Sequence, residues 1–423
     1  MQYKLRIGME PNMLYGKSNK PRNTRRLFGN VVGTCGIILV VLSVAILVEN
    51  FYFLEQPLWL TTAIALIICV LGIMASIFGF MHNYYKFSLQ LAKDNNPHQY
   101  KVVVIGGGTG LSMLLRGLKE YPIDVSAIVT VADDGGSSGR LRDEMEMPPP
   151  GDIRNVLVAL ADTEPLLEKL LQHRFNRGKN LSGHSIGNLL LAALQEITGD
   201  FKSAIREMSR VLAIRGKVIP VAEDLVQLVA KMKDGRVVRG ESTIPKAGGV
   251  IQRVFLEPTN INATPEAIEA IAEADLIVVG PGSLYTSVLP ALLVNGIADA
   301  IRQANATKVY VCNIMTQRGE TERYTAYDHI KAIYNHIGHE FFDAIVCHSG
   351  KVPDAVNLIY DRQGAGPVEV KIDKLKRLGL QVITKDLSIH QTYYRHDPQK
   401  VSELIVNILV EKPMREQQAM MKQ

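Results

Sequence analysis

Two adjacent aspartates, Asp133 and Asp134, are the residues whose type and position most directly suggest chemistry. They follow an apolar run, Val125–Val131, that is predicted to be a β-strand, and they lie a little over twenty residues beyond a run of glycines. Acidic side chains at this position hold a ribose hydroxyl in many nucleotide-binding folds. Two neighbouring carboxylates could also bind a divalent cation such as Mg²⁺, which prefers oxygen ligands. Asp133 and Asp134 are therefore candidates both for binding and for catalysis.

The glycine-rich segment before these aspartates is a predicted phosphate-binding loop. An apolar run, Lys101–Ile105, leads into it, and an amphipathic pattern, Leu111–Glu120, follows it. Glycines let the backbone approach an anion closely, and the start of a helix offers N–H groups and the positive end of its dipole. The segment lacks the last glycine of GxGxxG and the GK[ST] of a P-loop, so a tight strand-to-helix turn is the alternative. The candidate residues are Gly106, Gly107, Gly108, Thr109 and Gly110.

A run of small and polar residues follows the two aspartates. Its glycines are expected to supply flexible backbone, and its hydroxyls and guanidinium group are suited to binding phosphate. The alternative is a long solvated loop, but the carboxyl edge of a parallel sheet is where α/β proteins bind their ligands. The candidate residues are Gly135, Gly136, Ser137, Ser138 and Arg140.

Two further segments place polar residues near the predicted start of a helix. Asp152, just after three prolines, is suited either to bind a ligand or to cap the helix that follows. His184 is suited to donate to a phosphate or to act as an acid or base, because the pKa of histidine lies near neutrality. A single histidine at the start of a helix can equally be structural. The candidate residues are Asp152, Arg154, Asn155, His184 and Asn188.

A second glycine loop repeats the pattern of the first. A buried strand is expected to end at a Gly-Pro-Gly-Ser sequence, and a helix is expected to begin at about Leu284. The serine is suited to cap that helix or to bind phosphate. A polar residue also follows the next predicted strand, again at a carboxyl edge. The candidate residues are Gly280, Gly282, Ser283, Tyr285, Thr286 and Asn313.

The elements that must position these residues form an alternating pattern. Apolar runs of strand length alternate with amphipathic helices, which predicts a Rossmann-like α/β fold with a mostly parallel sheet. The predicted strands are Lys101–Ile105, Val125–Val131, Leu276–Val279, Lys308–Cys312, Ala344–Cys347 and Gln381–Ile383. The predicted helices include Leu111–Glu120, Leu189–Glu196, Pro265–Glu273 and Ala326–His336.

Composition and charge exclude several classes of protein. The chain has 423 residues, of which 47% are hydrophobic, and a net charge of +5. Seven basic residues and one acidic residue lie in the first 26 positions, so the rest is near neutral and offers no basic surface for nucleic acid. None of the four cysteines form a CxxC pair. His336 and His339 have no third ligand nearby, so no metal site is predicted from histidine or cysteine.

The N-terminal region is predicted to be a membrane hairpin. Residues 27–48 and 58–81 carry no charge, and each stretch is long enough to cross a bilayer as a helix. Basic residues flank the pair, whereas the connection between the stretches carries only Glu49 and Glu55, which predicts both ends in the cytoplasm. The alternative is a buried helical hairpin of a soluble domain. Neither stretch contains an ionisable residue, so a transport role has no support.

These patterns divide the chain into five parts. Residues 1–26 are expected to be a basic cytoplasmic tail, and 27–82 two transmembrane helices. Residues 83–99 are expected to be a linker, 100–410 a nucleotide-binding α/β domain, and 411–423 a tail. The protein is thus expected at the cell membrane with its main domain in the cytoplasm.

Six ordered blocks together resemble one family, the YvcK group of gluconeogenesis factors, which are relatives of the CofD 2-phospho-L-lactate transferases. The blocks are GGGTG at 106–110, TVADDGGSSGRLR at 130–142, PGDIRNVL at 150–157, GHSIGNLLLAAL at 183–194, GPGSLYTSVLP at 280–290 and CNIMTQRGET at 312–321. The resemblance implies a CofD-like domain that binds a UDP-sugar such as UDP-N-acetylglucosamine. It also implies a role in cell shape and envelope synthesis during growth on gluconeogenic carbon sources.

The resemblance leaves a second function open. CofD transferases move a phospholactyl group with Mg²⁺, and an acidic residue after the second strand, here Asp133 or Asp134, lies at their reaction site. The GGSSGR sequence departs from those enzymes, and the membrane hairpin departs from most family members, which are cytoplasmic. An NAD-linked oxidoreductase is a more distant alternative. Expected partners are a nucleotide-sugar, the membrane, further copies of the chain, cell-wall synthesis proteins and a Ser/Thr kinase, for which Thr384 and Thr392 are candidate sites.

Overall fold

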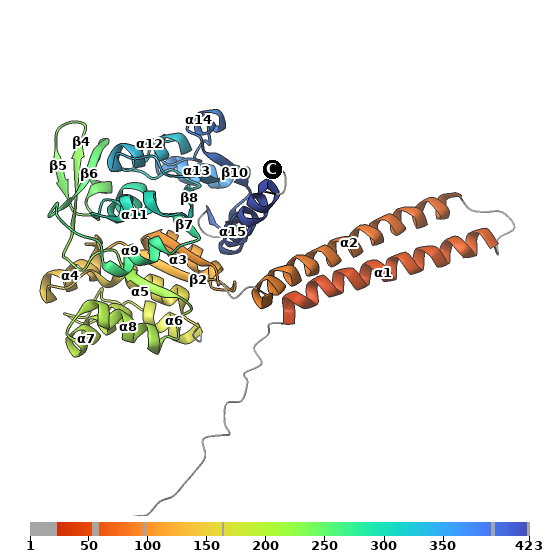
Figure 1. Cartoon of the computed structure of the whole chain (residues 1–423), viewed down its shortest axis with the longest axis horizontal. Coiled ribbons are helices and arrows are strands. Elements are labelled where there is room, and N and C mark those ends of the chain that lie inside the picture. The colour runs from red at the N-terminus through yellow and green to blue at the C-terminus, as the bar shows by residue number, and fades with distance from the viewer. Residues whose placement is uncertain (1–22, 53–58, 96–98, 163–164, 391–393, 421–423) are drawn as a thin grey trace, which may run out of the picture. The chain divides into compact units, whose positions relative to one another are not determined.

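The computed structural model describes residues 23–52, 59–95, 99–162, 165–390 and 394–420 (Figure 1). The chain divides into two compact units, one ending at His98 and the other beginning at Gln99. The first unit holds helices α1 (Asn23–Tyr52) and α2 (Trp59–Asn95), and the second holds all the other elements. The division lies next to residue 100, where the sequence predicts the α/β domain to begin.

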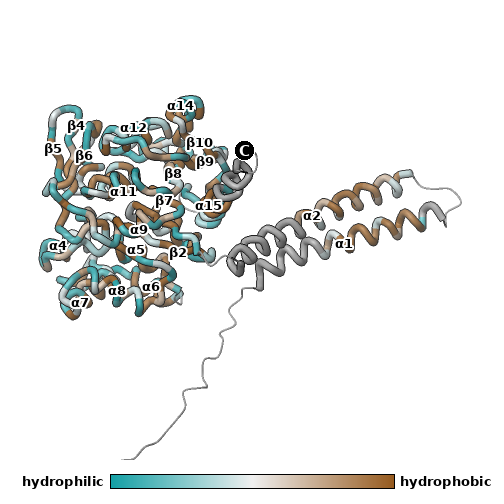
Figure 2. Tube along the Cα trace, in the orientation of Figure 1, coloured by the Kyte–Doolittle hydropathy of each residue, from teal (hydrophilic) through white to brown (hydrophobic). Residues whose placement is uncertain are grey.

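Small side chains bring α1 and α2 together. A Cβ atom on Gly36 of α1 would lie 2.6 Å from the carbonyl oxygen of Gly72 on α2, so only glycine allows this approach. Ser43 on α1 and Ala65 on α2 are also buried, whereas many large aliphatic side chains of both helices are exposed. Much of the described part of both helices is hydrophobic (Figure 2). Helices that pack within lipid have this arrangement, with small residues at the contact between the helices and large apolar residues on their outer sides.

The lengths of these two helices differ from the predicted spans. Among the described side chains, Trp59–Phe78 is long and apolar enough to cross a membrane, with a mean hydropathy of 2.5, and Thr34–Glu49 is a shorter apolar segment. Helix α2 continues to Asn95, so most of the stretch 83–99 that was expected to be a linker is helical. Its residues before Asn95, such as Leu91, Ala92 and Lys93, are good helix formers, which accounts for the difference.

Within the described part of the second unit, seven strands form one parallel sheet and the others form two small antiparallel sheets. The order in the large sheet is β10-β9-β8-β7-β1-β2-β3. Its strands are β1 (Lys101–Gly106), β2 (Asp124–Val129), β3 (Lys217–Pro220), β7 (Leu276–Val279), β8 (Thr307–Val311), β9 (Ala344–His348) and β10 (Gln381–Lys385). The small sheets contain β4 (Gln227–Met232), β5 (Val237–Arg239) and β6 (Ile251–Glu257), and β11 (Ser388–His390) and β12 (Tyr394–His396).

Helices connect these strands. Those in the first half of the domain are α3 (Gly108–Leu118), α4 (Gly136–Met145), α5 (Pro150–Leu160), α6 (Pro165–Gln172), α7 (Ile186–Thr198) and α8 (Phe201–Val211). Those in the second half are α9 (Pro265–Ala272), α10 (Leu289–Leu292), α11 (Ile297–Gln303), α12 (Ala326–Ile337), α13 (Asp354–Arg362), α14 (Ile372–Arg377) and α15 (Pro398–Met420). Two short elements, η1 (Ile244–Lys246) and the π-helical turn η2 (Leu284–Val288), complete the domain.

The predicted parallel α/β fold is confirmed. All six predicted strands are present, with ends shifted by at most two residues. The edge strand β3 and the sheet β4–β6 were not predicted, because their apolar runs are short and are interrupted by exposed charged residues such as Lys217 and Lys231. Helix α15 continues to Met420, so the stretch expected to be a tail from 411 is largely helical.

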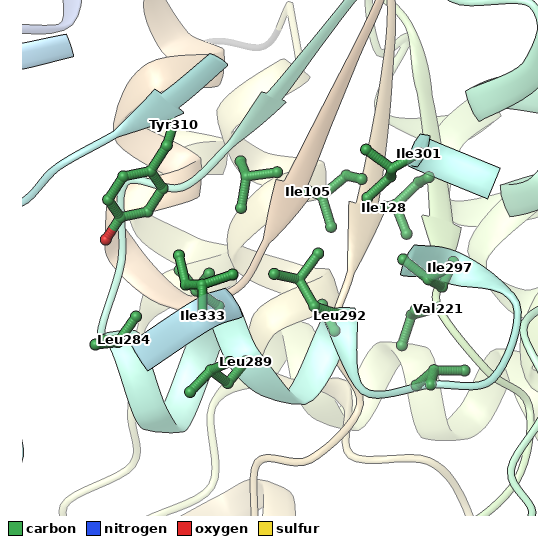
Figure 3. Close-up of a cluster of buried hydrophobic side chains, with 14 of the residues drawn as sticks. Ile105, Ile128, Val221, Leu284, Leu289, Leu292, Ile297, Ile301, Tyr310 and Ile333 are labelled. Atoms are coloured by element: carbon green, nitrogen blue, oxygen red, sulfur yellow. The ribbon is translucent and has the colours of Figure 1, made fainter. Parts of the chain in front are cut away.

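Two helical layers enclose the sheet. On one face, alternate strand residues such as Ile105, Ile128 and Tyr310 pack with apolar residues of α9 to α12 in one core cluster (Figure 3). The remaining strand residues, such as Val104 and Val278, point to the opposite face and are equally buried. Helices α3 and α5 pack side by side on that face, and α15 packs against α3.

The strand order reverses between β1 and β7. From β1 the chain proceeds through β2 to β3 at one edge, then returns to β7 on the other side of β1 and continues to β10. Both neighbours run parallel to β1, so the carboxyl ends of β1 and β7 lie side by side. Such a reversal opens a crevice in which parallel α/β proteins bind their ligands. The two predicted glycine loops follow these two strands.

Candidate functional site

The two glycine loops meet at the reversal between β1 and β7. A Cβ atom on Gly110 would lie 2.5 Å from the carbonyl oxygen of Pro281, so the first loop can touch the second only with glycine at this position. Gly108 has a φ of +65°, a left-handed conformation that glycine adopts readily. The close contact brings Gly106, Gly107 and Gly108 together with Gly280 and Gly282.

A carboxylate lies at the start of the helix that follows the first loop. Asp152, in the first turn of α5, accepts a hydrogen bond from the backbone N–H of Gly108, the first residue of α3. Withdrawal of Asp152 from water, reinforced by the nearby negative charge of Asp133, raises the pKa of Asp152 to about 7. Asp152 therefore does not cap α5, the helix that it was expected to cap, but satisfies an N–H at the start of α3.

At the second glycine loop, a different carboxylate accepts a hydrogen bond from a backbone N–H at the start of the helix that follows. Glu320 accepts a hydrogen bond from the backbone N–H of Tyr285 at 3.2 Å and another from the hydroxyl of Thr286 at 3.2 Å. Burial raises the pKa of Glu320 to about 7. The hydroxyl of Tyr285 pairs with that of Tyr324 at 2.8 Å. Tyr285 and Thr286, which the sequence marks as ligand-binding candidates, are therefore buried in the wall of the site and bonded to protein groups.

Side chains from the next strand fix the second loop. Asn313, which follows β8, donates to the carbonyl oxygen of Gly282 at 2.8 Å and accepts from its N–H at 3.3 Å. Gln317 donates to the hydroxyl of Ser283 at 2.7 Å. A helix begins at Leu284 as predicted, but its first five residues form the π-helical turn η2. Asn313 and Ser283 thus hold the loop in place.

The paired aspartates have different surroundings. Asp133 accepts from the N–H of Gly135 at 2.9 Å, which closes a tight turn before α4. Asp134 accepts from the N–H of Ser242 at 2.8 Å and so ties the end of β2 to the segment between β5 and η1. Asp133 also approaches α5, because a Cβ on Gly151 would overlap its Oδ2 atom. Asp133 therefore faces the interior of the site, and Asp134 anchors a neighbouring segment.

That segment brings in a carboxylate that the sequence did not suggest. Burial raises the pKa of Glu241 to about 8, and the negative charges of Asp133 and Asp152 add to the effect. Glu241 follows no motif and lies more than a hundred positions from Asp133, so its place in the site depends on how the β4–β6 sheet folds back. Asp133, Asp134, Asp152, Glu241 and Glu320 are close enough to influence one another, and we call these five residues the acidic wall.

A buried hydrogen-bond network lies beside the acidic wall. Asn188 donates to the hydroxyls of Ser137 at 3.1 Å and Ser138 at 3.5 Å, and Ser137 also pairs with Nδ1 of His184 at 3.0 Å. Arg154 donates to the Asn188 carbonyl oxygen at 2.8 Å. Arg154 also bonds the hydroxyl of Ser185 and the side chain of Asn155. Six of the predicted residues are thereby joined in one cluster: Ser137, Ser138, Arg154, Asn155, His184 and Asn188.

The GGSSGR sequence is helical, which corrects the prediction of a flexible loop. Helix α4 begins at Gly136, and Ser137 and Ser138 are buried. Their hydroxyls find partners on α7, so the segment is ordered by the network. The residue before the helix, Gly135, has no side chain to cap it, which leaves an N-terminus suited to an anion.

Three arginines surround this end of α4. Arg140 donates to the carbonyl oxygen of Ser182 at 2.8 Å, and Arg174 donates to that of Gly183 at 2.5 Å. Buried Arg154 is the third, and its Nε atom has no hydrogen-bond partner among the described residues. Burial lowers the pKa of His184, and the positive charge of Arg140 adds to the effect. We call Arg140, Arg154, Arg174 and His184 the basic cluster. Arg174 was not predicted, because it lies outside every motif.

The site as a whole has two parts with opposite charge. Within the described residues, no three histidine, cysteine, aspartate or glutamate side chains are grouped so that they could hold a metal ion.

Thr109 lies on the exposed first turn of α3. Of the two candidate phosphorylation sites, Thr384 is exposed on β10, and Thr392 lies outside the described residues.

Comparison with known proteins identifies relatives over most of the domain. Residues 102–388 match the family described as 2-phospho-L-lactate transferase CofD. The chain is 57% identical over 312 residues to the gluconeogenesis factor of Bacillus subtilis, which covers 74% of this chain and 98% of that protein. It is also 57% identical over 306 residues to the gluconeogenesis factor of Halalkalibacterium halodurans, covering 72% of this chain and 95% of that protein.

A solved structure agrees with these matches. The crystal structure of protein BH3568 from Bacillus halodurans is 56% identical, covers 73% of this chain and all of that chain, and superposes with a TM-score of 0.72. A second structure of the same protein, described as a member of the UPF0052 family, gives a TM-score of 0.71. These two gluconeogenesis factors and the solved chain thus consist almost entirely of a region that corresponds to the α/β domain. From the family match and these identities, the chain belongs to the CofD family and, within it, to the gluconeogenesis factors of the YvcK group.

Proposed function

We propose that this protein is a membrane-anchored, nucleotide-sugar-binding regulator of envelope synthesis. Its ligand is a UDP-sugar, with UDP-N-acetylglucosamine the leading candidate, and it acts in cell-shape maintenance during growth on gluconeogenic carbon sources. The names of the relatives support the gluconeogenic setting. The observation that carries the proposal is the pairing of the basic cluster and the acidic wall at the reversal of strand order.

The basic cluster suits the diphosphate of such a ligand. Three guanidinium groups and the uncapped start of α4 supply charge-assisted donors and a favourable dipole for anionic oxygens. Ser137 and His184 add donors at the same place. The unpartnered Nε of Arg154 is a further donor of the kind a phosphate oxygen would satisfy.

The acidic wall suits the hydroxyl-rich parts of the ligand. Carboxylates at the end of the second strand accept hydrogen bonds from ribose hydroxyls in related folds. Asp152 and Glu320 already occupy the N–H groups that follow the two glycine loops. A phosphate is therefore expected at α4 instead of at the starts of α3 and η2. This moves the diphosphate away from the position that the glycine motifs alone suggest.

The two N-terminal helices would serve as the membrane anchor. Their small residues face each other at Gly36 and Gly72, and their large aliphatic residues face outward. Trp59–Phe78 meets the length and hydropathy needed to cross a bilayer. Basic residues in the N-terminal 26 positions favour a cytoplasmic location for both ends of the hairpin and for the α/β domain.

A second candidate function is a Mg²⁺-dependent transferase of the phospholactyl type. The match to the family described as 2-phospho-L-lactate transferase favours it, together with the position of Asp133 facing the interior of the site. Asp133 and a substrate phosphate would hold the Mg²⁺ ion, which commonly binds one or two carboxylates plus phosphate oxygens. Bound Mg²⁺ would supply charge stabilisation for phosphoryl transfer.

Calorimetric titration separates the two functions. Residues 97–423 are titrated with UDP-N-acetylglucosamine, GDP and NAD, with and without Mg²⁺. Binding confined to the UDP-sugar and retained without metal supports the regulator. Metal-dependent GDP binding with no response to the UDP-sugar contradicts it and supports the transferase.

Variants then test the site. Arg154→Gln is expected to weaken UDP-sugar binding at least tenfold, because a buried charge-assisted donor is lost. Arg302→Gln, at an exposed position on α11, is the matched control and should bind normally. For Asp133→Asn, lost binding without any detectable reaction supports a regulator, whereas intact binding with lost product supports an enzyme.

Membrane attachment is tested separately. The full chain is expected in the membrane fraction and should resist extraction at high pH, whereas residues 97–423 should remain in the supernatant. Recovery of the full chain in the supernatant would contradict the anchor without affecting the ligand proposal.

A further inference from the structure

One stretch of the α/β domain, from α6 to the segment before α7, combines exposed leucines with exposed basic residues. Leu166 is 77% exposed, and Leu170 and Leu181 are each 47% exposed. Leu166 and Leu170 are four positions apart, so they share one side of α6. Three exposed basic residues accompany them, and we call these six residues the basic–leucine patch: Leu166, Lys169, Leu170, Arg177, Lys179 and Leu181. Exposed aliphatic residues grouped in this way usually mark a binding surface.

The patch is positively charged, although the chain after residue 26 is near neutral as a whole. Glu168 is the only acidic residue in the sequence from 165 to 195, and Arg116 pairs with it at 2.7 Å. Lys169, Arg177 and Lys179 form no ion pair within the part of the chain that the structure describes. Positive charge therefore lies next to apolar side chains without a carboxylate to balance it.

Hydrogen bonds hold the segment between α6 and α7 in one shape. The N–H of Phe175 donates to the carbonyl oxygen of His184 at 3.0 Å, and the N–H of Gly183 donates to that of Phe175 at 2.8 Å. Arg140 of the basic cluster donates to the carbonyl oxygen of Ser182 at 2.8 Å. A surface that is already ordered loses less conformational entropy when it binds. The patch therefore needs little rearrangement to take a partner.

The two features together favour anionic lipid as that partner. Basic side chains attract the headgroups of anionic lipids, and neighbouring aliphatic side chains enter the boundary between the headgroups and the acyl chains. An acidic peptide would match the basic residues but not the leucines. The proposed membrane anchor keeps the α/β domain close to a bilayer, so a surface of modest affinity is sufficient, because a tether raises the effective concentration of the second site.

We infer that the basic–leucine patch docks the α/β domain on the surface of an anionic bilayer. The three leucines enter the headgroup boundary, and Lys169, Arg177 and Lys179 contact the lipid phosphates. The same segment carries Gly183 and His184, so docking brings the basic cluster close to the membrane surface. The inference rests on the proposed anchor only for the nearness of the bilayer, and it does not depend on which ligand the site binds.

Vesicle sedimentation of residues 97–423 tests this inference without the anchor. The solved relative consists almost entirely of the corresponding region, so this fragment should fold without the hairpin. It is expected to sediment with vesicles made of equal parts phosphatidylglycerol and phosphatidylcholine, and to stay in the supernatant with phosphatidylcholine alone. Binding should weaken as the salt concentration is raised. Absence of sedimentation with the anionic vesicles, or equal sedimentation with both kinds, overturns the inference.

Variants test the location of the contact. The double variant Arg177→Gln, Lys179→Gln is expected to weaken vesicle binding by about tenfold or more, because two charges near the lipid surface are lost. Leu166→Gln should weaken it several-fold, because apolar contact is lost. The double variant Lys376→Gln, Arg377→Gln removes the same two kinds of charge from exposed positions on α14 and should bind as the wild type does. All three variants should keep the wild-type thermal midpoint, because the substituted residues are exposed.

Three outcomes have a different meaning. A loss in the α14 control as large as that in the patch variant overturns this location. Tighter binding to a polyglutamate peptide than to vesicles, unchanged by Leu166→Gln, identifies an acidic protein surface as the partner and overturns the lipid assignment. If the fragment binds anionic vesicles but the full chain is absent from the membrane fraction, the anchor is wrong and the docking surface stands.

Discussion

The backbone N–H of Tyr285 donates to the carboxylate of Glu320 at 3.2 Å. Glu320 thus satisfies an N–H group in the first turn of the helix that follows the second glycine loop. Asp152 does the same at Gly108 after the first loop. Both carboxyl groups have a pKa raised to about 7 by loss of solvent. The two glycine loops therefore combine an anion-binding geometry with a carboxylate that already uses it.

The first prediction concerns stability against pH. A carboxyl group whose pKa is higher in the folded state than in the unfolded chain binds more protons when folded. Stability is then greatest below the unfolded pKa, about 4.3 for glutamate, and falls as pH rises through the folded pKa. With pKa values of about 7 for Asp152 and Glu320 and about 8 for Glu241, the loss should extend from about pH 4 to about pH 8.

Glu320→Gln isolates one of these groups. The amide oxygen can still accept from Tyr285, but the group cannot ionise. Between pH 5.5 and pH 8.5 the wild type should lose about 2 kcal/mol of unfolding free energy that the variant keeps. Urea unfolding of residues 97–423 at both pH values measures this difference. Glu340→Gln, at an exposed position, should leave the pH dependence unchanged, and an identical pH dependence in Glu320→Gln would refute the assignment.

The second prediction links protons to the ligand. If an anionic UDP-sugar binds beside the acidic wall, ionised carboxylates oppose it, so affinity should fall as pH rises from 6.5 to 8.5. Glu241→Gln removes the group with the highest pKa of the three, and it should bind the ligand several-fold more tightly at pH 8.5 with little change at pH 6. Calorimetry in buffers of different ionisation enthalpy should show proton uptake in the wild type and less in the variant. Equal uptake in both would contradict a role for Glu241.

Local sequence patterns predict the strands and loops of the site, but they do not predict how segments far apart in the chain are arranged. The strands that carry the glycines are continuous apolar runs, so β1, β2 and β7 and the loops after them follow from local patterns. Parallel strands bring their carboxyl ends to one edge, and this predicts the convergence of Gly107, Asp133 and Gly282. The reversal between β1 and β7 is a property of the sheet order, which no local pattern specifies.

The residues that were not predicted reach the site through long-range packing. Glu241 comes from a segment beside a small antiparallel sheet, held by the bond from Ser242 to Asp134. Arg174 follows α6 and bonds a backbone oxygen of the segment before α7. Glu320 lies inside the CNIMTQRGET block, so a signal was present, but its contact with Tyr285 depends on the π-helical turn. Tyr285 and Thr286, whose motif predicts contact with a ligand, make hydrogen bonds to Glu320 and Tyr324 in this structure.

The third prediction concerns the buried network. Asn188→Ala removes the acceptor for Arg154 and the donor for Ser137 and Ser138, and leaves the Arg154 charge with fewer partners. The free energy of unfolding should fall by about 1–3 kcal/mol. Asn335→Ala, at an exposed position on α12, should change it by less than about 0.5 kcal/mol. Chemical denaturation measures both, and a loss in Asn188→Ala no larger than in the control would show that the network does not stabilise the domain.

The last prediction tests the contact between the two glycine loops. Gly110→Ala introduces a Cβ atom 2.5 Å from the carbonyl oxygen of Pro281, and neither backbone segment can yield without moving its loop. The variant should therefore separate the carboxyl ends of β1 and β7 and lose ligand affinity by more than tenfold. Gly366→Ala is the control, because a Cβ there meets no atom within 4 Å. If Gly110→Ala binds as the wild type does, the ligand does not depend on the apposition of the two loops. A variant with reduced stability but normal affinity would lead to the same conclusion, because the loops would have moved apart without affecting the site.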